Sequence, residues 1–189
     1  ESSALAAQFG GVPVEAAPIE EAPKAEAPKA EAPVEEATPN LDDLATKGIP
    51  AFHGFYGKSP RGYVIGDLGM HFAFTPSTAQ TKATDGNIVE YNLKLSNPLV
   101  VPQEPKNGAW HSPVRAIEAL EAAGVTFPEN LKNFASAFEQ QKSVVAGTEM
   151  DPAQRAILDK ISETVQQQGF DGILYKNEYE GGGYSAIAL

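Results

Sequence analysis

The chain has 189 residues, 42% of them hydrophobic, and no cysteine, so one domain with an appendage fits, and disulfides and cysteine nucleophiles are excluded. Residues 1–45 hold ten acidic side chains and two lysines, a net charge of −8, which leaves −3 of the total −11 for residues 46–189. This second part has no basic stripe, so tight nucleic-acid binding, which needs clustered Lys and Arg, is not expected.

Residues 1–45 are predicted to form an acidic, disordered linker rich in proline, alanine and glutamate. Prolines recur at every fifth position from 13 to 33, which blocks a continuous helix, while Glu and Lys keep the segment solvated. A tract for a proline-binding partner is the alternative, but no PxxP spacing occurs within these repeats. A semi-rigid spacer is therefore the preferred interpretation.

The sequence shows no sign of a signal peptide or of a membrane span. Residues 1–20 lack the basic start and apolar centre of a signal peptide, and no apolar run approaches the length of a membrane span. No membrane span is therefore expected. Because the sequence begins with Glu1, we expect a processed product or a segment of a longer polypeptide.

The globular domain is expected to span residues 46–189, after a single helical turn capped by Asn40. Apolar, aromatic or alternating patterns predict strands or extended segments at 49–56, 63–65, 70–74, 87–95, 99–102, 173–175 and 184–189. The capping residues Thr75, Ser112 and Asp151, together with Pro128 and helical spacing, predict helices at 76–83, 113–123, 128–145 and 152–169. Strands flank a helical block and the terminal pair returns to the early sheet, which is an α+β pattern.

The helical block supplies the expected core. Its apolar side chains at helical spacing are Ile117, Leu120, Leu131, Phe134, Phe138, Ile157 and Ile161. Trp110 is expected to be a loop aromatic that packs on the sheet.

A carboxylate pair, Glu178 and Glu180, stands in the predicted turn between the last two strands. Three glycines, at 181–183, follow the pair and let the backbone approach a ligand closely. A solvated hairpin turn is the simpler interpretation of this stretch taken alone.

Three histidines, His53, His71 and His111, complete the candidates for chemistry. No HExxH or comparable spacing is present, so a catalytic metal is not expected. GxSxG and phosphate-binding GxxxxGK[ST] motifs are absent from the sequence. Carboxylates, histidines and aromatics suit cleavage of a glycosidic bond, because its cationic transition state needs a nearby negative charge and hydrogen bonds to ribose.

The order of these motifs resembles the ADP-ribosyltransferase fold over roughly residues 48–189. The motifs are, in chain order, His53-Gly54, GMHFA (69–73) with STA (77–79), NIVEYNLKLSNPL (87–99) and GFDGILYKNEYEGGGYSAIAL (169–189). The similarity is greatest to the branch found as modules in large phage and mobile-element polyvalent proteins. The poly(ADP-ribose) polymerase and diphtheria-toxin group is more distantly similar. The resemblance implies an α+β fold with a split mixed or antiparallel sheet and a helical block.

The resemblance implies an NAD-dependent, toxin-like mono-ADP-ribosyltransferase, with NAD as substrate. His53 matches the histidine that hydrogen-bonds an NAD ribose, and Gly54 supplies backbone contacts to the nicotinamide amide. His71 stands where the family usually has a tyrosine that stacks on nicotinamide, and Phe72 is its buried neighbour. These four residues and Ser77 are the expected NAD-binding residues.

The catalytic residues implied by the resemblance are Glu180 and Glu178. Glu180 matches the carboxylate that binds the nicotinamide-ribose 2′-hydroxyl and stabilises the transition state. Glu178 resembles the first member of an E-x-E pair, which helps to activate the acceptor. In the polymerase-like branch the glutamate lies directly before the last strand, a place held here by Tyr184 and Ser185.

A protein acceptor in a bacterial host, and a location in the host cytoplasm or the phage virion, are implied by analogy. Two alternatives stay open. One is a catalytically inactive structural or interaction module of a phage virion protein, which the long helical block and His71 favour. The other is an NAD glycohydrolase, which needs no acceptor.

Overall fold

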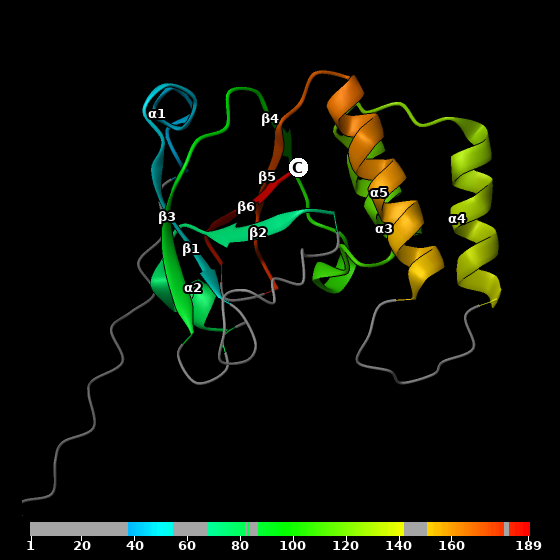
Figure 1. The fold of residues 1–189 in the computed structure, drawn as a ribbon, viewed down its shortest axis with the longest axis horizontal. Helices are drawn as coiled ribbons and strands as arrows, with labels where there is room; N and C mark the ends of the chain where they lie inside the picture. The colour runs from blue at the N-terminus through cyan, green and yellow to red at the C-terminus, as the bar shows by residue number, and fades with distance from the viewer. Residues whose placement is uncertain (1–37, 55–67, 82, 84–86, 142–150, 180–181) are drawn as a thin grey trace, which may run out of the picture. The chain divides into compact units, whose positions relative to one another are not determined.

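A computed structural model describes residues 38–54, 68–81, 83, 87–141, 151–179 and 182–189. In this part of the chain the strands are β1 (Ile49–Gly54), β2 (Met70–Ala73), β3 (Ile88–Leu93), β4 (Pro98–Val101), β5 (Gly172–Lys176) and β6 (Tyr184–Ala188). The helices are α1 (Leu41–Thr46), α2 (Pro76–Gln80), the short 3₁₀ helix η2 (Lys106–Gly108), α3 (Pro113–Ala122), α4 (Glu129–Gln141) and α5 (Pro152–Gln167) (Figure 1). The expected strand at 63–65 and most of the expected linker, residues 1–37, lie outside the described residues.

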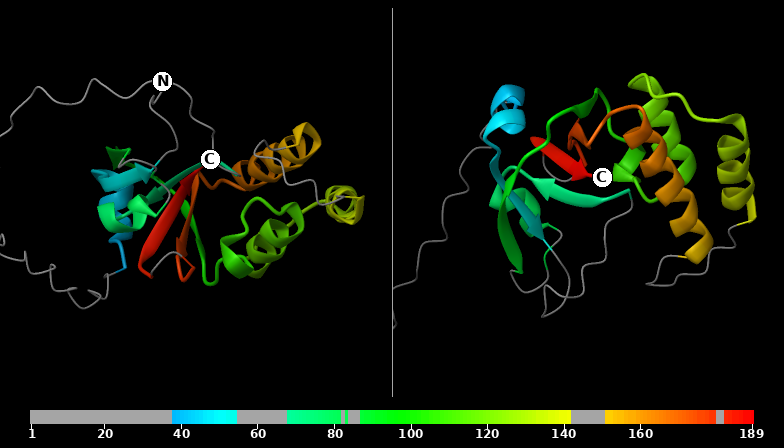
Figure 2. Two further views of the ribbon diagram at one scale, coloured as in Figure 1. Left: turned by 90° about the horizontal axis from the view of Figure 1, so that it is seen from below. Right: turned by 45° about the horizontal axis from the view of Figure 1, so that its top comes forward.

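The strands form one mixed sheet in the order β3-β1-β2-β6-β5-β4. Among the described strands, β4 and β5 alone pair in parallel, and the other neighbours are antiparallel. The C-terminal β6 lies between β2 and β5, which confirms that the terminal strands return to the early sheet. The fold is therefore mixed α+β, with α3, α4 and α5 grouped beside one part of the sheet (Figure 2).

Segment β4 was expected only as an extended exit from the preceding strand. It is a strand because Leu99 and Val101 turn inward into the core while the chain pairs in parallel with β5. The helical block α3–α5 is the crossover that a parallel connection requires.

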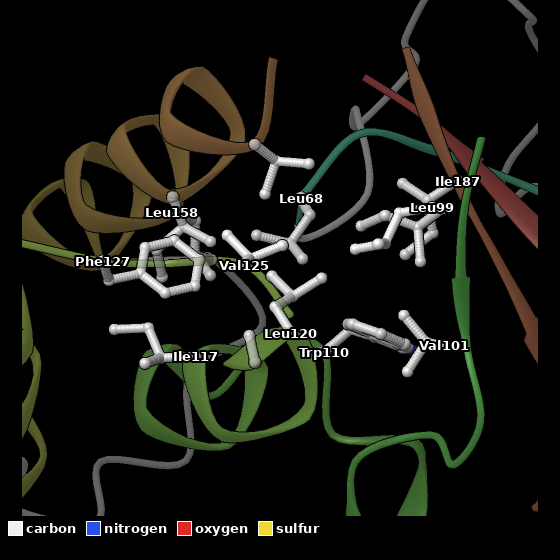
Figure 3. Close-up of a cluster of buried hydrophobic side chains, with 14 of the residues drawn as sticks. Leu68, Leu99, Val101, Trp110, Ile117, Leu120, Val125, Phe127, Leu158 and Ile187 are labelled. Carbon is white, nitrogen blue, oxygen red and sulfur yellow. The ribbon is translucent and has the colours of Figure 1, made fainter. Parts of the chain in front are cut away.

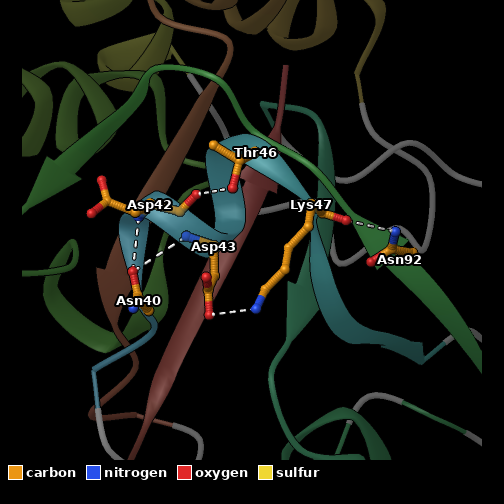
Figure 4. A network of polar contacts seen from close by, with 6 residues as sticks. All are labelled: Asn40, Asp42, Asp43, Thr46, Lys47 and Asn92. Atoms are coloured by element: carbon orange, nitrogen blue, oxygen red, sulfur yellow. Dashed lines mark hydrogen bonds and ion pairs between the residues drawn. The ribbon is translucent and has the colours of Figure 1, made fainter.

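Side-chain caps begin four of the helices. The capping residues are Asn40, Thr75, Ser112 and Asp151, as their positions in the sequence predicted. The Asn40 side-chain oxygen accepts from the backbone N–H groups of Asp42 and Asp43, at 2.9 and 3.2 Å (Figure 4). At the other ends, Gly124 and Gly169 adopt positive φ values of 97° and 95° just after α3 and α5.

Helix α1 precedes the expected start of the domain at residue 46, yet it is part of the folded unit. Its Leu44 is fully buried in a cluster on one face of the sheet. The Nδ2 of Asn92, on β3, donates to the Lys47 carbonyl at 3.2 Å and ties the end of α1 to the sheet (Figure 4). The other members of this cluster are Ala51, Phe72, Leu93, Leu95, Leu174 and Ala186.

The opposite face of the sheet packs against the helical block. The sheet contributes Leu99, Val101, Ile173, Tyr175 and Ile187, the loop before α3 contributes Trp110, and the block contributes Ile117, Leu120, Ile157, Leu158, Ile161 and Val165 (Figure 3). Burial of this apolar surface stabilises the fold by about 25 cal/mol per Å² removed from water. This is the larger of the two clusters and it fixes the position of the sheet centre.

Helix α4 differs from the expected core in one residue. Phe134 was expected to be buried, but it is 59% exposed. The helix instead packs through Leu131, Ala135 and Phe138, which follow an i, i+4, i+7 row that excludes Phe134. The apolar residues of α4 extend around the helix beyond the face that packs on the core, so Phe134 falls outside that face.

The Asp171 carboxylate links the start of β5 to the residues that precede β4. Its oxygens accept from the backbone N–H groups of Ser96 and Asn97, at 2.5 and 3.0 Å. Asp171 also donates its own N–H to the Asn97 carbonyl at 3.3 Å. The aspartate near the start of the 169–189 motif is therefore explained by backbone contacts that align two parallel strands.

Replacing Asp171 by alanine should lower the free energy of unfolding by about 2 kcal/mol, because two backbone donors lose a charged acceptor. Urea denaturation measures this change. Asp159→Ala is the matched control, since Asp159 is an exposed aspartate on α5, and its effect should stay within about 0.5 kcal/mol. Equal effects of the two substitutions would show that the carboxylate contacts contribute nothing to stability.

Candidate active site

The polar side chains of the sheet centre gather on the face that carries the helical block. Across β6, Ser185 pairs with both Ala73 of β2 and Tyr175 of β5. Directly paired residues share a face, and so do residues two apart on one strand. His71, Tyr175, Asn177 and Ser185 therefore lie on one face, although they come from three strands.

His53 lies on the other face of the sheet. Phe52 pairs with Ala73, so the next residue along β1, His53, points to the opposite side, as does Phe72. The rings of His53 and Phe72 are 6.0 Å apart between centroids. Phe72 is buried in the cluster formed with Leu44, so the structure places it in the core of this face.

One hydrogen bond connects the two histidines predicted to bind NAD. The Nδ1 of His53 lies 2.7 Å from the backbone carbonyl oxygen of His71, and His53 is 9% exposed. A carbonyl oxygen only accepts, so Nδ1 carries the hydrogen. The His53 ring thus holds the backbone of β2, while the His71 ring lies on the far side of the sheet.

The His71 ring meets a tyrosine that the sequence analysis did not select. The Nδ1 of His71 is 3.4 Å from the hydroxyl oxygen of Tyr175. Tyr175 is 3% exposed, and its ring centroid is 5.0 Å from that of Trp110, at an interplanar angle of 57°. Trp110 is 1% exposed, which confirms that this loop aromatic packs on the sheet.

Beyond Tyr175, the strand enters the turn through a buried amide. Asn177 is 2% exposed, and its Nδ2 donates to the hydroxyl oxygen of Ser185 at 3.0 Å. Its backbone N–H donates to the Gly183 carbonyl at 2.8 Å and its carbonyl accepts from the Gly182 N–H at 2.9 Å. Positive φ values of 88° and 82° at these two glycines allow that turn, so part of the glycine run serves backbone geometry.

Of the two predicted catalytic carboxylates, the structure describes one. Glu178 is exposed in the turn after β5. Glu180 lies outside the described residues. The next residue after Glu178, Tyr179, donates its backbone N–H to a carboxylate oxygen of Glu104 at 2.7 Å, so an acidic side chain from the loop after β4 holds this turn.

Gly54 and Ser77 lie at the end of β1 and the start of α2. A Cβ at Gly54 would stand 2.1 Å from the Ala79 carbonyl oxygen, so the helix α2 requires glycine there whether or not a ligand is bound. Ser77 is exposed, and its hydroxyl is 3.0 Å from that of the capping residue Thr75. The structure therefore gives both residues a local packing or capping role and does not bring Ser77 to the polar side chains of the sheet centre.

Four residues of the site were not selected from the sequence: Tyr175, Asn177, Ser185 and Glu104. The first two follow the period-two alternation of β5 that begins at buried Ile173, so the strand pattern could have placed them on one face. Ser185 and Glu104 required knowledge of the strand order and of the loop after β4. Sequence alone gives neither.

The described residues contain no group of three His, Cys, Asp or Glu side chains placed to hold a metal ion. Among the described helices, none has the length and apolar character needed to cross a membrane.

Comparisons of the chain with protein-family models, with curated proteins and with solved structures each found no match.

Proposed function

We propose that this domain is an NAD-dependent mono-ADP-ribosyltransferase that transfers ADP-ribose to a protein acceptor. The observation that carries the proposal is the adjacency of β1, β2, β6 and β5. It gathers three segments distant in sequence, which carry His53, His71 and the turn with Glu178. These are the segments in which the resemblance expects the contacts to NAD.

The two histidine rings lie on opposite faces of the sheet, but each ring taken singly has a chemistry compatible with NAD. With Nδ1 of His53 donating to a carbonyl, the neutral ring carries its lone pair on Nε2, the form that accepts a hydrogen bond from a ribose hydroxyl. His71 is half-buried, and its planar ring can stack on nicotinamide as a tyrosine would. Phe72, buried on the other face, supports β2 from within the core.

The proposed reaction breaks the bond between C1′ of the ribose and the nicotinamide nitrogen, and both electrons of that bond leave with nicotinamide. Glu180 stabilises the positive charge that develops on the ribose. Glu178 accepts the proton of the attacking acceptor group as this group forms its bond to C1′. Charge and atoms balance without a redox partner or a metal.

A catalytically inactive structural or interaction module is the second candidate function. It is favoured by the histidine at position 71 and by the exposed position of Glu178, outside the buried polar side chains of the sheet centre. An NAD glycohydrolase would use the same residues, with water in place of the protein acceptor.

The test is incubation of the protein with NAD, with and without a bacterial lysate, followed by measurement of free nicotinamide and of ADP-ribose attached to lysate proteins. We expect nicotinamide release and labelled proteins. Release without labelling would assign glycohydrolysis. No release, together with no change in melting temperature on adding NAD, would assign the inactive module.

A further inference from the structure

We propose that Tyr175 is a positioning residue for His71, whose tautomer and ring orientation it sets for contact with nicotinamide. The inference rests on the proposed function for its ligand, but the contact that it describes can be tested without NAD. Neither the motifs nor the resemblance assigns a role to Tyr175.

Tyr175 is suited to this task because it is buried and closely packed. It projects from β5, between the parallel neighbour β4 and the antiparallel neighbour β6. It is 3% exposed, and the indole of Trp110, itself 1% exposed, packs on its ring. Its hydroxyl is therefore held at a fixed point by packing on both strands and on the loop before α3.

His71 is fixed from two sides. Its backbone carbonyl accepts from the His53 ring at 2.7 Å, and its own ring nitrogen Nδ1 lies 3.4 Å from the Tyr175 hydroxyl. The first contact holds the strand and the second bears on the rotation of the side chain. The Tyr175 hydroxyl is therefore one of the groups that bear on the orientation of the ring.

The chemical consequence concerns the second ring nitrogen. A tyrosine hydroxyl can donate to Nδ1 or accept from it, and in a neutral imidazole the choice decides whether Nε2 carries the hydrogen or the lone pair. The Nε2 atom itself is buried, so nicotinamide would meet the face of the His71 ring. The Tyr175 hydroxyl therefore bears on the tautomer of the ring and on the direction in which that face is turned.

The experiment compares Tyr175→Phe with wild type and with Tyr91→Phe. Phenylalanine keeps the ring that packs on Trp110 and removes only the hydroxyl. Tyr91, on β3, packs edge-on against Phe72 on the other face of the sheet, at a centroid distance of 5.3 Å. Tyr91→Phe therefore removes a hydroxyl that is remote from the His71 ring. The ¹⁵N chemical shifts of the imidazole rings report the tautomers of the three histidines, with exposed His111 as an internal reference.

In Tyr175→Phe we expect the ¹⁵N shifts of His71 to change while those of His111 stay constant, and the KM for NAD to rise about fivefold with a smaller change in kcat. Tyr91→Phe should leave the His71 shifts unchanged. If Tyr175→Phe does not fold, incorporation of 3-fluorotyrosine alters the acidity of the hydroxyl with little change of shape and should move the same resonances.

Unchanged His71 shifts in folded Tyr175→Phe, or under fluorotyrosine incorporation, would overturn the positioning role whatever NAD does. Altered shifts with an unchanged KM would overturn its relevance to NAD while the proposed function stands. Altered shifts in a protein that neither binds nor cleaves NAD would refute the proposed function, and with it the role toward nicotinamide.

Discussion

Glu180→Gln should lower the rate of nicotinamide release from NAD by roughly 10³ while the protein stays folded, because an amide keeps the size of the carboxylate but cannot offset the positive charge on the ribose. Initial rates at saturating NAD measure the loss, and thermal unfolding checks the fold. NAD binding should persist, since the substitution removes an interaction that strengthens mainly in the transition state.

Glu178→Gln is the matched control for this result. Glu178 stands two residues earlier in the sequence, it is exposed, and it has the same charge and length as Glu180. Its substitution should spare the breakage of NAD but reduce the labelling of acceptor proteins, because its proposed role is to take the acceptor proton. If Glu180→Gln retains full activity, the carboxylate assignment is wrong, and the position before the last strand, held by Tyr184 and Ser185, becomes the place to look.

Gly54→Ala should lower the free energy of unfolding by about 3 kcal/mol, a large effect for one methyl group. The added Cβ would stand 2.1 Å from the Ala79 carbonyl oxygen and 3.2 Å from the Ala83 amide nitrogen. Both are backbone atoms, so relief requires α2 to move away from β1. Because His53 precedes Gly54, that movement should also weaken NAD binding in any protein that remains folded.

The comparison for Gly54→Ala is Gly124→Ala. Gly124 has a φ of +97° and no atom within 4 Å of an added Cβ, so its cost is conformational, about 1–2 kcal/mol. Chemical denaturation of the two variants separates steric from backbone effects. Equal losses would mean that contact with α2 is not what requires glycine at position 54, and a ligand contact would then become the better explanation.

Local signals in the sequence predicted most of the secondary structure. The caps at Asn40, Ser112 and Asp151 are short-range devices, since each side chain bonds an amide two or three residues away, and the sequence states them directly. The alternation in residues 87–95 likewise needs only a half-buried strand. Phe134 shows the limit, because spacing identifies an apolar face but not how much of it a neighbour covers.

The candidate site depended on contacts that the sequence does not state. Tyr175 meets His71 across more than one hundred residues, and Asn177 meets Ser185 only because β6 runs back beside β5. The histidines could be selected as reactive residue types, but their placement on opposite faces follows from strand register. A one-residue change of register between β1 and β2 would have put the His53 and His71 rings on the same face.

The position of β6 also determines when the sheet can be completed during synthesis. Strands β3, β1 and β2 form one group and β5 and β4 another, and β6 alone joins them. Residues 184–188 leave the ribosome after all the other described strands. Until then β2 and β5 each present an unpaired edge on which a foreign strand could pair. The sheet of this domain can therefore be completed only when its last strand is available. Because β6 must pair with β2 across more than one hundred residues, we expect folding to be slow.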